Sequence, residues 1–158
     1  MGKIAFVFSG QGAQKAGMGK SFYDNNETVK DLFDRAETLR NGTLAQCFSG
    51  TAEELKETQN TQPCLYLTDL AAAIALSEAG IPVDGVAGFS LGELPALAFA
   101  GAYSHLDGFR LACIRGRAMA KAAAERIIAR VKGLDKGPGR LSIISGNLIN
   151  GESVRALM

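Results

Sequence analysis

The sequence predicts an α/β domain organised around a parallel sheet. Residues 4–8 and 82–87 are short apolar runs that end in glycine-containing turns, as the buried strands of such sheets do. Apolar residues at helical spacing lie between these runs, and a further helical stretch follows the second. A strand, a helix, a strand, a turn and a helix in this order imply parallel strands joined by right-handed crossovers.

The first predicted strand ends in the sequence SGQG, and two helices are predicted before the second strand. Residues 26–39 form the first of these helices. Its apolar face consists of Val29, Leu32, Phe33 and Ala36. The second helix opens at Asn60 with Pro63 in its first turn, where proline is favoured. Its apolar periodicity continues to Leu76, and Gly80 ends it.

Two helices are predicted after the second strand. Residues 91–100 form a short one, and Ser104 with Asp107 resembles a capping box that opens another. After about Arg130 the pattern weakens. There KGLDKGPGR predicts a loop or strand edge, LSIISG one more strand, and SVRALM a terminal helical turn.

The composition is that of a soluble globular protein of one domain. The chain has 158 residues, of which 47% are hydrophobic and 21% charged, and its formal net charge is +1. This balance argues against nucleic-acid or membrane-surface binding. No apolar run approaches the roughly 20 residues that span a bilayer. The cysteines Cys47, Cys64 and Cys113 show no CxxC spacing, which favours a reduced, cytoplasmic compartment.

The sequence GFSLG at residues 88–92 matches the G-x-S-x-G nucleophile elbow, with a predicted strand before it and a helix after it. Such a strained turn lifts Ser90 clear of the sheet, and the two glycines leave room for the neighbouring backbone. The helix start directs N–H groups and a positive dipole end toward an oxygen that gains charge. Ser90 is therefore the candidate nucleophile. A helix-capping serine in an ordinary strand–helix turn is the alternative.

Four motifs occur in the order FVFSGQGAQKAGMG, TQPCLYLTDLA, GFSLGELPALAFAGAYS and RGRAM. Together they resemble the malonyl-CoA:acyl carrier protein transacylases and the acyltransferase domains of fatty-acid and polyketide synthases, over about residues 3–121. The resemblance implies an α/β-hydrolase-like core interrupted by a ferredoxin-like small subdomain, here absent or only partly present. We expect residues 1–124 to form the large-subdomain core. Residues 125–158 would be a remnant of the small subdomain or a shortened return to the core.

The same resemblance implies transfer of a malonyl group from coenzyme A to the phosphopantetheine thiol of acyl carrier protein. Ser90 would carry the acyl group, and the backbone N–H groups of Gln11 and Leu91 would form the oxyanion hole. Arg115 would bind the malonyl carboxylate, and Gln62 of the TQP motif would line the same pocket. The implied partners are malonyl-CoA and acyl carrier protein. No cofactor and no metal are expected.

The residues around Arg115 favour a binding role without the resemblance. On a helix of about 100° per residue, Arg115 shares a face with Leu111, Ala118, Met119 and Ala122. The opposite face carries Arg110, Arg117 and Lys121, which either are solvated or attract an acidic carrier protein or coenzyme A phosphates. An inward guanidinium needs a carboxylate, because an unpaired buried charge is costly. The malonyl carboxylate suits it as a bidentate partner, and a carboxylate of the chain itself is the alternative.

Two departures from the family pattern bear on activity. Phe89 stands where the family usually has a histidine, and nothing matches the family's catalytic histidine. His105 is the single histidine of the chain, and it lies past the far end of the helix that begins near Ser90, roughly 15 Å away. A base must come within about 3 Å. Three functions therefore stay open: malonyl transfer, a GxSxG esterase or thioesterase, and an inactive domain that binds acyl-CoA or carrier protein.

Overall fold

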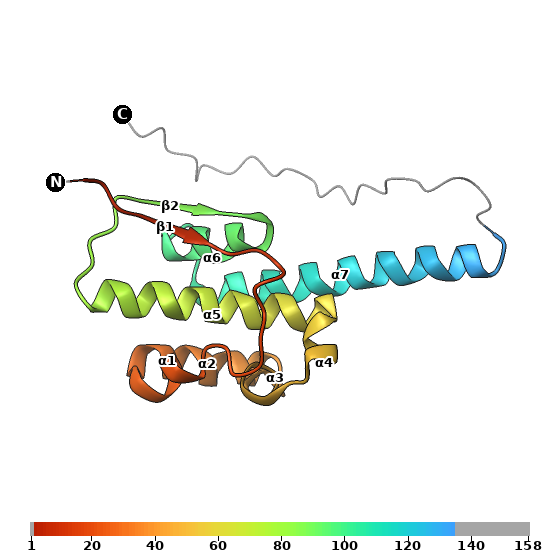
Figure 1. Ribbon diagram of the computed structural model, residues 1–158, viewed down its shortest axis with the longest axis horizontal. Coiled ribbons are helices and arrows are strands. Elements are labelled where there is room, and N and C mark those ends of the chain that lie inside the picture. Colours follow the sequence, from red (N-terminus) through yellow and green to blue (C-terminus); the bar gives the residue numbers. More distant parts are fainter. Residues whose placement is uncertain (1, 135–158) are drawn as a thin grey trace. The chain divides into compact units, whose positions relative to one another are not determined.

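The computed structural model describes residues 2–134, and it confirms the predicted parallel α/β arrangement. Strand β1 (Ala5–Phe8) pairs in parallel with β2 (Gly85–Gly88), with Ala5 opposite Gly85. Both strands lie within three residues of their predicted bounds. Parallel neighbours need a long crossover connection. The helices between the two strands supply it (Figure 1).

All described helices lie between Lys20 and Val131. They are α1 (Lys20–Asn25), α2 (Glu27–Leu39), α3 (Thr43–Ser49), α4 (Ala52–Lys56), α5 (Thr58–Glu78), α6 (Glu93–Phe99) and α7 (His105–Val131), with the 3₁₀ turn η1 (Ser90–Gly92) before α6. Met1–Ala120 form one compact unit, and a second unit begins at Lys121, inside α7. Within the first unit, α5 lies between the layer of α1, α2 and α3 and the layer of α6 with the sheet (Figure 1).

The main core of the first unit is helical. Phe33 of α2 is fully buried and stacks on Phe48 of α3, with their ring centroids 5.8 Å apart. Tyr66 of α5 and Phe109 of α7 are also fully buried, with centroids 6.3 Å apart. The Tyr66 hydroxyl donates to the backbone carbonyl of His105 at 2.8 Å, so burying it leaves no unpaired polar group.

Only one face of the sheet is covered in the described part of the chain. The rings of Phe6 and Phe8 pack on Phe99 of α6, with centroids 5.6 and 6.0 Å away. On the opposite face the side chain of Val7 is 77% exposed. The prediction of two fully buried strands was therefore wrong. A continuous apolar run is typical of a strand covered on both sides, and the described helices cover this sheet on one side only.

The start of α2 was predicted more accurately than the start of α5. Helix α2 begins within one residue of its predicted start, and Asn26 caps it, since its side chain accepts the Val29 N–H at 2.9 Å. Helix α5, in contrast, begins at Thr58, so that Pro63 lies inside the helix rather than in its first turn. The hydroxyl of Thr61 donates to the carbonyls of Leu55 and Glu57, which ties this early first turn to α4.

The buried face of α7 is not the predicted one. Its buried residues are Gly108, Phe109, Ala112, Cys113 and Gly116. Leu111 and Met119, which share a face with Arg115, are 43% and 38% exposed. Small residues decide the contact, because a side chain on Gly108 would collide with the Tyr66 hydroxyl. The predicted face carries Leu111 and Met119, whose longer side chains do not allow so close an approach.

The C-terminal predictions are largely untested. The predicted strand LSIISG, the helical turn SVRALM and most of KGLDKGPGR lie outside the described residues. Helix α7 ends at Val131, and Gly133 has a positive φ of 68°, a conformation that favours glycine. Among residues 2–134, no helix is both long enough and apolar enough to span a bilayer.

Candidate active site

Ser90 lies at a strained turn between β2 and α6. Its φ is 55°, and it is the one residue other than glycine with a positive φ in the described part of the chain. A serine pays about 1 kcal/mol or more for this conformation, which persists only where the surrounding structure enforces it. The 3₁₀ turn that begins at Ser90 leads directly into α6, and the Ser90 side chain is exposed.

The two glycines of the motif are sterically required. A Cβ on Gly88 would collide with the carbonyl of Gly92. A Cβ on Gly92 would collide with the carbonyl of Phe8 and would lie 2.6 Å from that of Ser9. The end of β1, the end of β2 and the turn therefore approach one another by backbone alone. This packing holds Ser90 at the carboxyl ends of both strands, where open α/β sheets bind their ligands.

The loop after β1 lies against the same turn. The N–H of Phe89 donates to the carbonyl of Phe8 at 3.2 Å. A Cβ on Gly10 would lie 2.8 Å from the Phe89 ring, so the loop passes directly beside the residue that precedes Ser90. The Gln11 side chain donates to Thr58 Oγ1 at 3.3 Å, which ties this loop to the start of α5. The predicted oxyanion residue Gln11 is thus in the neighbourhood of the elbow. Leu91, the other one, follows Ser90 in the turn with its side chain fully buried.

Arg115 reaches the serine from α7. Its Nη2 donates to Ser90 Oγ at 3.3 Å. The guanidinium makes no ion pair with a carboxylate among residues 2–134, so the structural alternative of a local Asp or Glu partner has no support there. Close packing of α7 sets this position, because a Cβ on Gly116 would lie 2.9 Å from the carbonyl of Thr58.

Gln62 is fully buried between α5 and α7. Its Nε2 donates to the sulfur of Met119 at 3.2 Å. Its Oε1 is buried and has no hydrogen-bond partner within the described residues. Buried amide oxygens are normally paired, so this atom can accept a further donor. The side chain of Gln62 lies 3.5 Å from the position of a Cβ on Gly116, the residue after Arg115.

One polar pair near the site was missed by the sequence analysis. Ser9, which directly precedes the Gly10–Gln11 loop, donates its hydroxyl to both carboxylate oxygens of Asp69, at 2.9 and 3.1 Å. Burial raises the pKa of Asp69 from 3.8 to about 6, although the hydrogen bonds from Ser9 lower it. A signal was present in the sequence: Asp69 is the single charged residue of α5 before Glu78.

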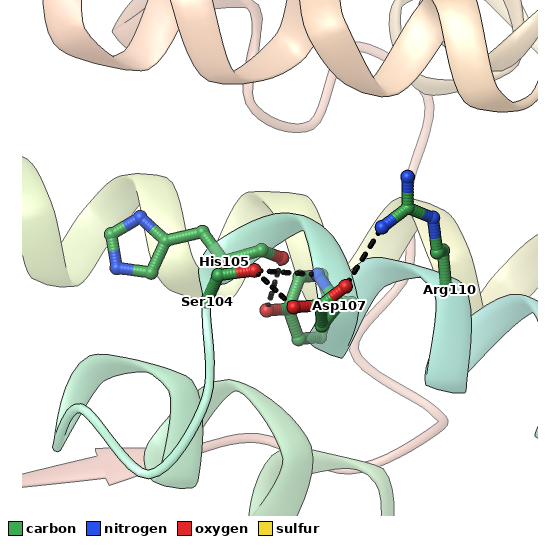
Figure 2. Close-up of polar contacts among 5 residues, drawn as sticks. Ser104, His105, Asp107 and Arg110 are labelled. Carbon is green, nitrogen blue, oxygen red and sulfur yellow. Dashed lines mark hydrogen bonds and ion pairs between the residues drawn. The ribbon is translucent and has the colours of Figure 1, made fainter.

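His105 is not brought to Ser90. Its backbone begins α7, and Figure 2 shows its imidazole pointing away from the contacts of Ser104, Asp107 and Arg110. His105 lines a cavity of about 510 Å³ whose lining includes neither Ser90 nor Arg115. Burial lowers the pKa of His105. That His105 is not the base stays a prediction.

Comparison with known proteins identifies the family of this chain. Residues 5–142 match the acyl transferase domain family. The chain belongs to this family. Malonyl CoA-acyl carrier protein transacylase of Bacillus subtilis (strain 168) is 45% identical over an alignment of 138 residues, and the match covers 85% of this chain and 44% of that relative. The chain therefore spans less than half the length of this curated relative.

Solved structures agree with this assignment. Malonyl CoA-acyl carrier protein transacylase from Clostridium perfringens superposes with a TM-score of 0.69 at 39% identity, covering 73% of this chain and 37% of the other. A malonyl-transacylase in complex with its type II polyketide synthase acyl carrier protein gives a TM-score of 0.70 at 34% identity, covering 77% and 40%. Both confirm the partial acyltransferase fold predicted from the four motifs.

Proposed function

We propose that this chain accepts a malonyl group from coenzyme A on Ser90 and passes it to the thiol of acyl carrier protein, in the cytoplasm. The observation that carries the proposal is the contact between Arg115 Nη2 and Ser90 Oγ, 3.3 Å apart, at a strained turn. It pairs an exposed hydroxyl with a cation that makes no ion pair within residues 2–134. A substrate with a carboxylate a few atoms from its reactive carbonyl satisfies both groups at once.

In the first step, Ser90 Oγ attacks the thioester carbonyl of malonyl-CoA. The serine proton goes to the departing sulfur, so a serine ester and free coenzyme A are formed. Negative charge builds on the carbonyl oxygen during the attack, and the N–H groups of Gln11 and Leu91 are the proposed donors to it. Arg115 holds the malonyl carboxylate as a bidentate partner, which replaces its contact with the serine.

In the second step, the phosphopantetheine thiol of the carrier attacks the serine ester. A new thioester forms and Ser90 recovers its proton. A general base accelerates such proton transfers by about 10²–10⁴-fold. Within residues 2–134, Ser90 Oγ accepts a hydrogen bond from Arg115 and donates none to a basic group. We therefore propose that loading by this chain alone is slow.

The division of the chain belongs to the same proposal. Residues 1–124 would be the acyl-accepting core of the large subdomain. Residues 125–158 would be a remnant of the small subdomain or a shortened return to the core. The described part of the site, including Gln62 as a pocket residue, falls entirely within the proposed core.

Intact-mass analysis after incubation with malonyl-CoA tests the proposal. We expect one malonyl adduct on the chain and none on Ser90→Ala. Adduct formation at another residue, or equal labelling of the variant, would overturn the assignment of Ser90. Steady release of free malonate without carrier protein would favour the esterase or thioesterase alternative.

The role of Arg115 is tested by comparing two substrates. Arg115→Ala should slow malonyl loading by about 30-fold or more, the loss expected for a charge-assisted bidentate contact. Acetyl-CoA has no free carboxylate, so its loading should stay constant. Lys121→Ala is the control, because it removes an exposed cation from the same helix. Equal losses for both substrates would make Arg115 a structural residue.

A further inference from the structure

A cluster of three arginines lies on the side of α7 that faces away from Ser90. Arg40, at the end of α2, and Arg110 and Arg117 of α7 line one cavity of about 190 Å³. The rest of the lining is Leu39, Phe109, Cys113 and Ile114. At about 100° per residue, Arg110 and Arg117 lie roughly 140–160° around the helix from Arg115. The cavity is therefore distinct from the proposed malonyl site.

The cavity has more guanidinium groups than carboxylates to balance their charge. Arg110 pairs with Asp107 at 2.7 Å (Figure 2). Arg117 makes no hydrogen bond or ion pair within residues 2–134. Asp107 balances one of the three guanidinium charges. The other two have no carboxylate partner among the residues that line the cavity or pair with its lining.

Arg40 is oriented by neutral oxygens only. Its Nη1 donates to Thr43 Oγ1 at 3.2 Å and to Gln46 Oε1 at 2.7 Å. Its Nη2 donates to Asn60 Oδ1 at 2.8 Å, and Asn60 is itself buried. These contacts fix the guanidinium in place and leave its charge without an anion. Such pre-organised, uncompensated arginines are suited to recognising an oxyanion.

The guanidinium groups of Arg40 and Arg117 both lie near the thiol of Cys113. Burial raises the pKa of its thiol, while both Arg40 and Arg117 act to lower it. The buried Cys113 thiol therefore lies within electrostatic range of both guanidinium groups. Phe109, which is fully buried, and the partly exposed side chains of Leu39 and Ile114 form the apolar part of the cavity lining.

We propose that this cavity binds the phosphate group of a small molecule, between Arg40 and Arg117. A phosphate monoester carries a charge of about −1.5 to −2 at neutral pH. That charge matches the two uncompensated guanidinium groups, whereas a single carboxylate would leave one of them unpaired. The phosphate belongs either to coenzyme A or to a separate phosphate ester. This site goes beyond the proposed acyl transfer and does not depend on it.

Titration of the full chain with inorganic phosphate at constant ionic strength, followed by calorimetry and by alkylation of Cys113, tests the site. We expect saturable binding that slows Cys113 alkylation. Arg117→Leu should weaken binding about tenfold or more, since it removes charged hydrogen bonds. Arg117→Lys should weaken it less. Arg35→Leu is the matched control, because Arg35 is an exposed arginine of the same helix that ends near Arg40.

Several results would overturn the proposal. These are the absence of saturable phosphate binding, equal weakening by Arg35→Leu, and acetate or malonate binding as tightly as phosphate. Ser90→Ala should leave phosphate binding unchanged, so failure of the acyl-transfer proposal would be seen separately. Competition by coenzyme A, with 3′-dephospho-coenzyme A weaker, would assign the phosphate to the coenzyme. Phosphate binding without such competition would assign it to a separate ester.

Discussion

The helical core and the strand–turn region of the first unit are held together by different kinds of contact. In the core, Phe33, Leu67 and Phe109 are fully buried and packed by side chains on every side. In the strand–turn region, Val7 is 77% exposed and Phe89 is 73% exposed, and contact is made by backbone through glycines. The core thus holds its shape by burying apolar side chains. The proposed site depends on close backbone approach.

This difference explains how Ser90, in an exposed turn, and Arg115, on a helix that packs against the core, come to lie together. Ser90 is fixed by its neighbours in the turn, and Arg115 is carried to it by α7, which the core holds in place through its small residues. A change in the core should therefore alter stability most. A change at the turn should alter the site at a smaller cost in stability.

Phe33→Ala should lower the free energy of unfolding by about 3–5 kcal/mol, the usual cost of emptying a fully buried phenylalanine site. Val7→Ala is the contrasting change and should stay within about 0.5 kcal/mol, because that side chain is exposed. Urea unfolding of both variants gives the comparison. A large loss for Val7→Ala would mean that this face of the sheet is covered in solution.

Gly88→Ala should lower the free energy of unfolding by about 1–3 kcal/mol, as overpacking does, because its Cβ meets the Gly92 backbone. It should also abolish malonyl loading, since the turn must open to make room. Gly85→Ala in the same strand is the control, because no atom lies within 4 Å of its Cβ. Equal tolerance of both changes would show that backbone approach at the turn is not required.

Asp69→Asn should change how stability depends on pH. The pKa of Asp69 is raised to about 6 in the folded chain, so folding favours the protonated carboxyl and wild-type stability falls as the pH rises from about 4 to 6. The variant should be more stable than the wild type at pH 7 by about 1–2 kcal/mol, after solvent screening is allowed for. The two should be equal near pH 4.

Urea unfolding of both chains across this pH range measures the difference, in which all other titrating groups cancel. Asparagine can still accept the hydrogen bond from the Ser9 hydroxyl, so the local structure is kept. A difference that stays constant with pH would show that Asp69 does not titrate with a raised pKa. A less stable variant at pH 7 would mean that the carboxylate has a cationic partner in solution.

The elbow was predictable because its requirements are local. Two glycines around a serine, after an apolar run, specify a strained turn whatever the rest of the chain does. The buried face of α7 was not, because it depends on which partner the helix meets. Gly108 and Gly116 fit against Tyr66 and Thr58, and nothing in the spacing of α7 itself reveals those partners.

Short helices were also missed, though one carried a readable signal. Thr51 and Glu54 form a complete capping box at the start of α4, with the Thr51 side chain accepting the Glu54 N–H and the Glu54 side chain accepting the Thr51 N–H. This T-x-x-E pattern is visible in the sequence. Helix α3 begins after Gly42 without a side-chain cap, so no comparable signal marks its first turn.

Ser104→Ala should have the smallest effect, about 1 kcal/mol, because Ser104 caps α7 through one hydrogen bond from the Asp107 N–H at 3.1 Å. Its hydroxyl also donates to the Asp107 carboxylate at 2.6 Å, and both contacts are exposed, so water replaces them in part (Figure 2). Ser104→Asp is the control: a carboxylate can still cap the helix, but it repels Asp107. In urea unfolding, the wild type should therefore have a higher free energy of unfolding than either variant. If Ser104→Ala costs as much as Phe33→Ala, the start of α7 belongs to the core, and the proposed division between core and site fails at the helix that carries Arg115.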